Sequence, residues 1–175
     1  MKKVLLAIDG IDPNKKILDY AVELCKRIRA ELNILQVIDR RIYKDYLKKM
    51  QKGLSAASKY FDSSMVAITF AEAGDHKTAI ELMPDALNNI KSMLPENQKD
   101  KIGYNLKMTG GNSGQEIIDY VEKNRDVVMA IYDPATEFQN KNEERFKSSE
   151  KRNNAISKKI QRKLSIPLVV IGSSK

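Results

Sequence analysis

The fold is decided by the first 39 residues, in which a buried strand pattern appears twice with a helix between. The run VLLAI at residues 4–8 is continuously apolar and ends at Asp9 and Gly10, as is typical of a strand buried on both faces of a parallel sheet. A second apolar run follows at residues 32–38. Residues 14–28 carry apolar side chains at helical spacing, with charged residues opposite. This strand, helix and strand predict a right-handed parallel crossover.

The second half of the chain repeats this alternation of strands and helices. Residues 104–109 alternate between apolar and polar side chains, which predicts an edge strand with one face in water. Fully apolar strands are expected at residues 127–132 and 168–171, and Ile156, Ile160 and Leu164 mark a helix between them. The chain is therefore expected to form an α/β sheet of five parallel strands, with helices on both faces.

Two helix starts are suggested by capping residues. Asp12 followed by Pro13 predicts an N-cap with proline at the first helical position. Ser113, with Glu116 three positions later, has the spacing of a capping box, in which the serine side chain caps the helix.

Two segments, residues 40–103 and 133–154, are longer than the connections that a five-stranded parallel sheet requires. Residues 40–103 contain apolar residues at helical spacing, which predicts a helical insertion between the second and third strands, with Pro84 in a first turn or at a kink. Residues 133–154 are expected to form a long basic loop. No repeat or linker divides the chain, so residues 1–175 are expected to form a single domain.

The positive charge of the chain is concentrated in one segment. The 31 Lys and Arg residues outnumber the 23 Asp and Glu residues, which gives a net charge of +8. Residues 139–163 hold nine basic and three acidic residues, so 9 − 3 = +6 of that charge lies there. Such a segment is typical of a solvated surface, and also of a surface that binds nucleic acid, anionic lipid or phosphate.

The cysteine and histidine content excludes several kinds of site. Cys25 is the single cysteine and His76 the single histidine, which excludes an internal disulfide and leaves too few ligands for a Cys/His zinc site. Cys25 lies on the apolar face of the first helix, where burial makes a thiol inert. Asp9 and Asp133 could meet at the strand ends as a Mg²⁺ site, but paired aspartates are common there, and we predict neither a metal site nor a catalytic site.

No feature of the sequence directs the chain to a membrane. No apolar run approaches the ~20 residues that span a bilayer, and Asp9 interrupts the amino-terminal run. A cytoplasmic protein is therefore expected.

Several segments together resemble the universal stress protein family. They are KKVLLAIDG at residues 2–10, the helix at 12–32, NILQVID at 33–39, GNSGQEIIDYVEK at 111–123 and IPLVVIG at 166–172. The resemblance implies a Rossmann-like sheet of the adenine nucleotide alpha hydrolase type, with strand order 3-2-1-4-5. It also implies a role in the stress response.

Many members of that family bind ATP at the carboxyl ends of the strands, and the resemblance implies where this chain would do so. Asp9 matches the acidic residue that ends the first strand, and Val37 matches the apolar residue that lines the adenine pocket. The family's glycine motif, G-x2-G-x9-G-[ST], is absent, because its first two positions fall on Ile131 and Pro134. Counted back from the last strand, the later glycine falls on Asn154, and Ala155 takes the place of the hydroxyl residue.

Loss of these glycines removes backbone amides that could approach phosphate closely. For this reason no bound cofactor is expected. The positions that match the family's binding residues are Asp9, Val37, Ile131 and Asn154. The chain is expected to be a non-enzymatic regulatory protein that acts through protein contacts. One alternative is binding of ATP or another nucleotide, with basic side chains in place of the glycines: Arg145, Lys147, Lys151 and Arg152. A second alternative is nucleic-acid binding through residues 139–163.

The last strand predicts how two copies of the chain would associate. The resemblance places it at a sheet edge, yet its residues are apolar on both faces: Leu168, Val169, Val170 and Ile171. An exposed apolar edge favours pairing with another strand. We therefore expect a homodimer formed through this strand, as in relatives that dimerise there.

Overall fold

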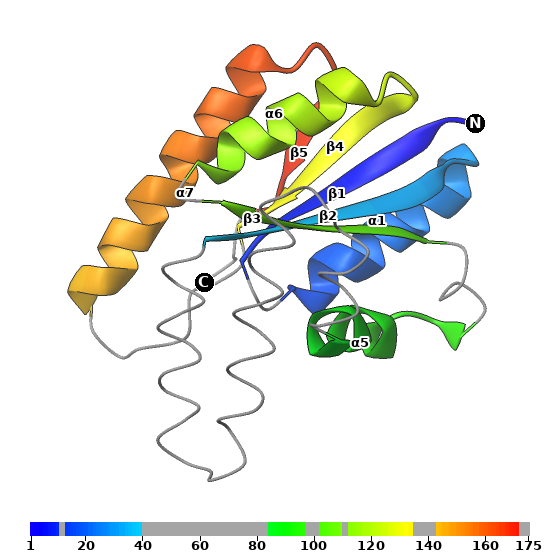
Figure 1. Cartoon of the computed structure of the whole chain (residues 1–175), viewed down its shortest axis with the longest axis horizontal. Coiled ribbons are helices and arrows are strands. Elements are labelled where there is room, and N and C mark those ends of the chain that lie inside the picture. The colour runs from blue at the N-terminus through cyan, green and yellow to red at the C-terminus, as the bar shows by residue number, and fades with distance from the viewer. Residues whose placement is uncertain (11–12, 40–83, 97–101, 110–111, 135–142, 172–175) are drawn as a thin grey trace, which may run out of the picture.

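The computed structural model describes residues 1–10, 13–39, 84–96, 102–109, 112–134 and 143–171. Its sheet consists of β1 (Lys3–Asp9), β2 (Glu31–Asp39), β3 (Gly103–Thr109), β4 (Val127–Asp133) and β5 (Leu168–Val170). The helices are α1 (Lys15–Ile28), α5 (Pro84–Met93), α6 (Ser113–Lys123) and α7 (Glu143–Lys163). All four strand pairs are parallel and the order is β3-β2-β1-β4-β5, which confirms the predicted sheet (Figure 1).

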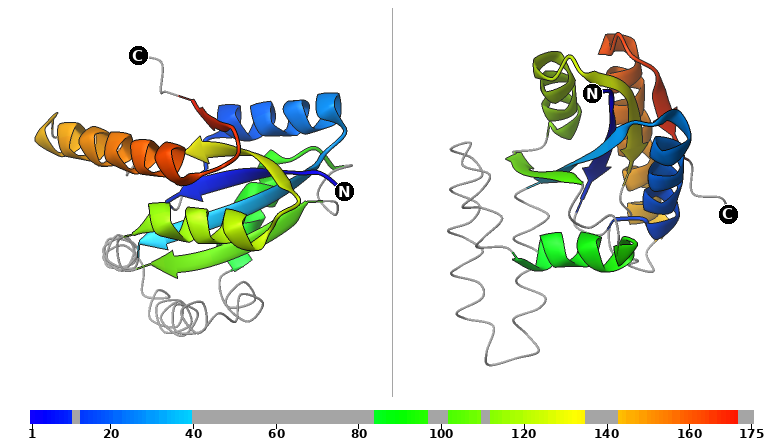
Figure 2. Two further views of the ribbon diagram at one scale, coloured as in Figure 1. Left: turned by 90° about the horizontal axis from the view of Figure 1, so that it is seen from above. Right: turned by 90° about the vertical axis from the view of Figure 1, so that its right-hand side faces the viewer.

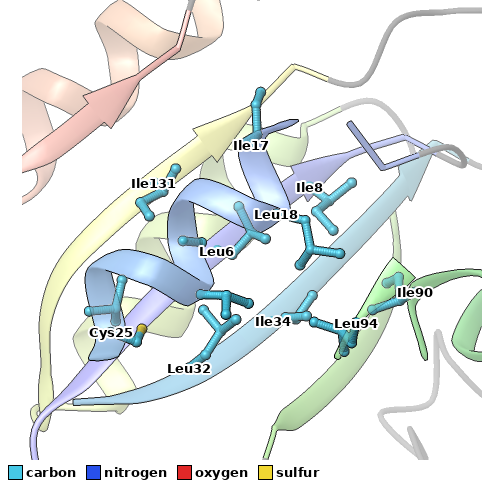
Figure 3. Close-up of a cluster of buried hydrophobic side chains, with 13 residues drawn as sticks. Leu6, Ile8, Ile17, Leu18, Cys25, Leu32, Ile34, Ile90, Leu94 and Ile131 are labelled. Atoms are coloured by element: carbon cyan, nitrogen blue, oxygen red, sulfur yellow. The ribbon is translucent and has the colours of Figure 1, made fainter. Parts of the chain in front are cut away.

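Alternating side chains of the strands build two separate cores. On one face, Leu6 and Ile8 of β1 pack with α1 and with Ile90 of α5 (Figure 3). On the other face, Leu5 and Ala7 pack with α6 and α7. Because both faces of β1 are covered, this strand is apolar throughout and its five residues from Val4 to Ile8 are fully buried.

The start of α1 differs from the prediction. Asn14 is the N-cap, and its side-chain oxygen accepts a hydrogen bond from the Lys16 amide at 3.0 Å, so the helix begins at Lys15. The predicted cap Asp12 lies outside the described residues. Asparagine caps a helix as well as aspartate does, which explains why the two could not be distinguished by residue type.

Helix α7 begins earlier than the sequence pattern indicated. Residues 133–154 were expected to form a loop, but the helix runs from Glu143 to Lys163, so the second half of that segment is helical. The apolar spacing marks only the part of α7 that packs on the sheet, whereas its first turns extend past the carboxyl ends of the strands (Figure 2). A helix can continue there without apolar residues, because Glu, Lys and Arg have high helix propensity.

The predicted helical insertion is only partly within the described residues. Helix α5 is described over Pro84–Met93, and its Ile90 is buried on the α1 side of the sheet. Residues 40–83 lie outside the described part of the chain. No helix in that described part is long and apolar enough to cross a membrane.

A polar cluster at the start of β3 explains one glycine. Asn33 donates a hydrogen bond to the Tyr120 hydroxyl at 2.7 Å, and Asn105 donates to the same hydroxyl at 3.1 Å. A Cβ atom at Gly103 would overlap the side-chain oxygen of Asn33. Glycine at this position therefore lets the cluster form.

We expect Gly103→Ala to lower the free energy of unfolding by about 1–2 kcal/mol, because the added methyl group displaces Asn33 from Tyr120. Urea denaturation measures this cost. The control is the same substitution in an Asn33→Ala background, where the obstructing oxygen is gone and the cost should fall by more than about 0.5 kcal/mol. Equal costs in both backgrounds would contradict this explanation of Gly103.

Candidate functional site at the carboxyl edge of the sheet

Three aspartates end neighbouring strands at the carboxyl edge of the sheet. Asp9 ends β1, Asp39 ends β2 and Asp133 ends β4. Their exposed fractions are 8%, 4% and 2%, so all three carboxyl groups are buried. Burial of several carboxyl groups at one edge requires hydrogen bonds and an opposing charge, and the structure supplies both.

Asp9 is held by side chains from two other elements. Its Oδ2 atom accepts a hydrogen bond from the Ser113 hydroxyl at 2.8 Å and another from the Tyr132 hydroxyl at 2.9 Å. Ser113 is the first residue of α6, and Tyr132 is the penultimate residue of β4. These bonds connect the central strand to its neighbour and to a covering helix.

Arg152 of α7 reaches the same group from the opposite side. Its Nη2 atom lies 3.9 Å from Asp9 Oδ1 and 4.0 Å from Asp39 Oδ2, so one guanidinium is shared by two buried carboxyl groups. We call Asp9, Asp39, Ser113, Tyr132 and Arg152 the Asp9 network. With both aspartates ionised, its charge sums to −1.

The network changes the acidity of its members. Burial raises the pKa of Asp9, while the hydrogen bond from Ser113, the charge of Arg152 and the hydrogen bond from Tyr132 oppose that rise. Burial, and then the charge of Asp9, raise the pKa of Tyr132 far above its ordinary value. The tyrosine hydroxyl therefore acts as a hydrogen-bond donor to Asp9 rather than as an acid.

Asp133 lies on the other face of the sheet and binds the start of α1. Its Oδ2 atom accepts a hydrogen bond from the Asn14 amide at 2.8 Å, which fixes the helix N-terminus against β4. Burial raises the pKa of Asp133 to about 6, and the charge of Asp9 adds to this rise, while the Asn14 amide opposes it. The Asp9–Asp133 pair considered as a Mg²⁺ site is thus divided between two faces. Within the described residues, no three His, Cys, Asp or Glu side chains group as metal ligands.

The turn after β1 is fixed by β2. Gly10 has a φ of 145°, which favours glycine, and its amide donates to the Val37 carbonyl at 2.9 Å. Its own carbonyl accepts a hydrogen bond from Gln36 Nε2 at 2.8 Å, and the Tyr104 hydroxyl donates to Gln36 Oε1 at 2.6 Å. Hydrogen bonds with β2, which are supported in turn by β3, therefore fix the path of the backbone where it leaves β1.

The structure does not bring the four family-matched positions together. Asp9 is in the network, and Val37 is fully buried in the core beneath α6 and α7. Ile131 is fully buried in the opposite core, beneath α1. Asn154 is exposed on α7. As binding positions these four remain predictions.

Three residues of the network were not predicted as site residues: Ser113, Tyr132 and Asp39. Arg152 was expected only as one of the basic side chains that could bind phosphate, and the structure places it against Asp9 and Asp39 instead. Ser113 was expected to cap α6, but Asn112 is the N-cap, and the Ser113 hydroxyl turns to Asp9 instead. Glu116, the other half of the predicted capping box, forms an ion pair with Lys107. Asp39 could have been found, because it follows the second strand as Asp9 follows the first.

The raised pKa of Asp133 predicts a pH-dependent stability. A folded-state pKa above the ordinary 3.8 means that folding favours the protonated form, so this group destabilises the protein as pH rises from about 4 through 6. Asp133→Asn should therefore raise the free energy of unfolding at pH 7.5 by about 2–3 kcal/mol, and the gain should vanish near pH 4. Urea titrations at several pH values measure this difference.

Asp19→Asn is the matched control, because that carboxyl group is half exposed on α1. Its effect should stay within about 0.5 kcal/mol at every pH. A loss of stability in Asp133→Asn at pH 7.5 would contradict the assignment of Asp133 as a buried group that resists ionisation.

Comparison with known proteins places the chain in a family. A model of the universal stress protein family matches residues 1–129. A proposed universal stress protein of Staphylococcus aureus (strain USA300) is 29% identical over 114 residues, which cover 62% of this chain and 65% of that protein. The chain thus matches less than two thirds of that relative's length.

Solved structures share the same fold. The universal stress protein UspA from Lactobacillus plantarum superposes with a TM-score of 0.52 at 12% identity, covering 98% of this chain and 97% of that one. The hypothetical protein MJ0577 gives a TM-score of 0.54 at 15% identity, covering 99% of this chain and 97% of that one. Because the family model covers well over half of its residues, the chain belongs to the universal stress protein family.

Proposed function

We propose that this chain is a regulatory universal stress protein of the cytoplasm, which acts as a homodimer through protein contacts and does not hold ATP through a glycine loop. The observation that carries the proposal is the burial of Asp9, Asp39 and Asp133 at the carboxyl edge of the sheet. A triphosphate placed at this edge would meet three carboxyl groups, and Arg152 is already within ion-pair distance of two of them. The electrostatics of the edge therefore disfavour a polyanionic ligand.

The backbone that follows β4 supports the same conclusion. Ile131, at the first position of the missing motif, is fully buried inside β4, and Pro134, at the second, has no amide hydrogen. Phosphate binding by backbone amides requires donors that are free to face the ligand. Neither residue offers one.

The alternative, binding of ATP or another nucleotide through basic side chains, would use Arg152 in place of the glycines. In that case Arg152 would have to leave Asp9 and Asp39, and two buried carboxyl groups would lose their cation. Removal of one partner from a buried ion pair is strongly unfavourable. We therefore favour a chain without bound nucleotide over this alternative, and native mass spectrometry distinguishes the two.

A non-catalytic role is supported by the chemistry of the candidate nucleophiles. Burial raises the pKa of the Cys25 thiol to about 11, so it is not a thiolate near neutral pH. The Ser113 hydroxyl donates its hydrogen to a carboxyl group rather than to a histidine base.

The proposal of a dimer rests on β5. This strand lies at the edge of the sheet and is apolar, and Val170 is 47% exposed. An apolar edge strand is a template for pairing with a second strand. A twofold contact between two β5 strands would cover Val170 in both copies.

Native mass spectrometry of freshly purified protein tests both parts of the proposal. We expect a species of twice the 19.9 kDa chain mass, without the added mass of a nucleotide. A species that carries ATP or another nucleotide would support the alternative and contradict our assignment of the carboxyl edge.

A pair of variants tests the dimer surface. Val170→Lys places a charge on the edge strand and should give monomers at micromolar concentration in light scattering. Ile28→Lys is the matched control, since Ile28 is 42% exposed on α1, and it should remain dimeric. A dimeric Val170→Lys protein, or a monomeric parent chain, would rule out pairing through β5.

A further inference from the structure

The second part of α7, residues 151–163, carries cations without acidic residues, whereas its first turns include Glu143, Glu144 and Glu150. Residues 151–163, KRNNAISKKIQRK, contain six Lys or Arg residues and no Asp or Glu. Arg152 points to the Asp9 network, and Lys159 donates to the Asn112 side chain at 3.1 Å. The remaining four are exposed: Lys151, Lys158, Arg162 and Lys163.

Three of these exposed cations lie in one row along the helix. Lys158 and Arg162 follow Lys151 by seven and eleven residues, which are close to two and three full helical turns. We call Lys151, Lys158 and Arg162 the cationic stripe. It extends for roughly 16 Å at the helical rise per residue. Helix α7 lies along one side of the molecule, so the stripe is on the surface (Figure 2).

Helix α1 of the same protein shows how a solvated charged face is otherwise built. Lys15 pairs with Asp19 at 3.7 Å, and Lys26 and Arg27 both lie within 4 Å of Glu23. Among the side chains that the structure describes, which leave out those of residues 143–150, no carboxylate forms an ion pair with the cationic stripe. Like charges one turn apart, such as Lys158 and Arg162, also repel each other. The cationic stripe thus differs from the charged face of α1, where Lys15, Lys26 and Arg27 each lie near a carboxylate of the same helix.

The composition of the face indicates the kind of polyanion that fits it. Asn154 and Ala155, which lie between the cations, are exposed and small, so an extended chain of phosphates can approach the helix closely. Residues 151–163 contain no aromatic residue that could stack on bases, and the row of cations contains no large apolar residue that could enter a membrane. Lys and Arg side chains that contact only phosphates bind nucleic acid without recognising its base sequence.

We propose that the cationic stripe of α7 binds the phosphate backbone of nucleic acid without sequence preference. This inference does not depend on the nucleotide chemistry of the carboxyl edge, because the three residues of the cationic stripe are exposed and none of them belongs to the Asp9 network.

Fluorescence anisotropy with a labelled 20-base-pair DNA duplex tests the proposal. Three phosphate contacts predict a loss of affinity of about 40-fold between 50 and 200 mM NaCl, through release of counterions. The triple variant K151Q/K158Q/R162Q should bind at least about tenfold more weakly than the parent chain at 50 mM NaCl.

The matched control is the triple variant K15Q/K26Q/R27Q, which removes the same charge from α1. Its affinity should stay within about threefold of the parent value, since its cations are paired on their own helix. Circular dichroism confirms that both variants are folded. Equal losses in the two variants would show that net charge alone causes binding, and would overturn the proposal. Absence of binding at 50 mM NaCl would overturn it, as would equally effective competition by poly-glutamate, which would identify an acidic polypeptide as the partner.

Discussion

The carboxyl group of Asp9 is the point at which the elements of this protein are joined. It ends the central strand, accepts hydrogen bonds from Ser113 of α6 and Tyr132 of β4, and shares Arg152 of α7 with Asp39 of β2. This one side chain thus contacts groups from three other elements, and through Arg152 it is linked to a fourth, β2. Since a buried carboxyl group is tolerated only when it is hydrogen bonded and offset by charge, the positions of α6 and α7 are coupled to the end of β1.

The same arrangement bears on our proposal that the carboxyl edge of the sheet does not hold ATP. In an α/β sheet the crevice beyond the carboxyl ends of the strands is the usual place for a ligand. Here the acidic residue that the family resemblance assigns to binding is engaged with the protein itself, and Arg152 supplies the cation. The same helix that supplies Arg152 also carries four exposed cations: Lys151, Lys158, Arg162 and Lys163. One cation of α7, Arg152, thus partly neutralises buried carboxyl groups, while these four cations remain on the surface of the protein.

Much of the fold could be predicted from sequence because its determinants are local. The apolar run of residues 4–8 and the helical spacing of α1 follow from burial alone, and the strand order follows from the family resemblance. The site could be predicted only in part. Asp9 was found because it ends a strand, but the partners of Asp9 depend on contacts between residues far apart in sequence, such as Ser113 and Arg152. The capping pattern assigned Ser113 to a cap, and its tertiary contact with Asp9 overrides that pattern. Apolar spacing placed Arg152 in a loop, because it does not register a helix that continues through polar residues of high helix propensity.

The central claim is that Asp9 and Arg152 stabilise the protein together, and a double-mutant cycle measures this directly. The cycle compares the free energy of unfolding of the parent chain, Asp9→Asn, Arg152→Gln and the double variant at pH 7.5. We predict that Arg152→Gln costs about 1–3 kcal/mol alone, and at least about 1 kcal/mol less when Asp9 is already neutral, because fewer buried charges are then left without a cation. Costs that add within about 0.5 kcal/mol would contradict the account, since they would mean that the two residues act independently.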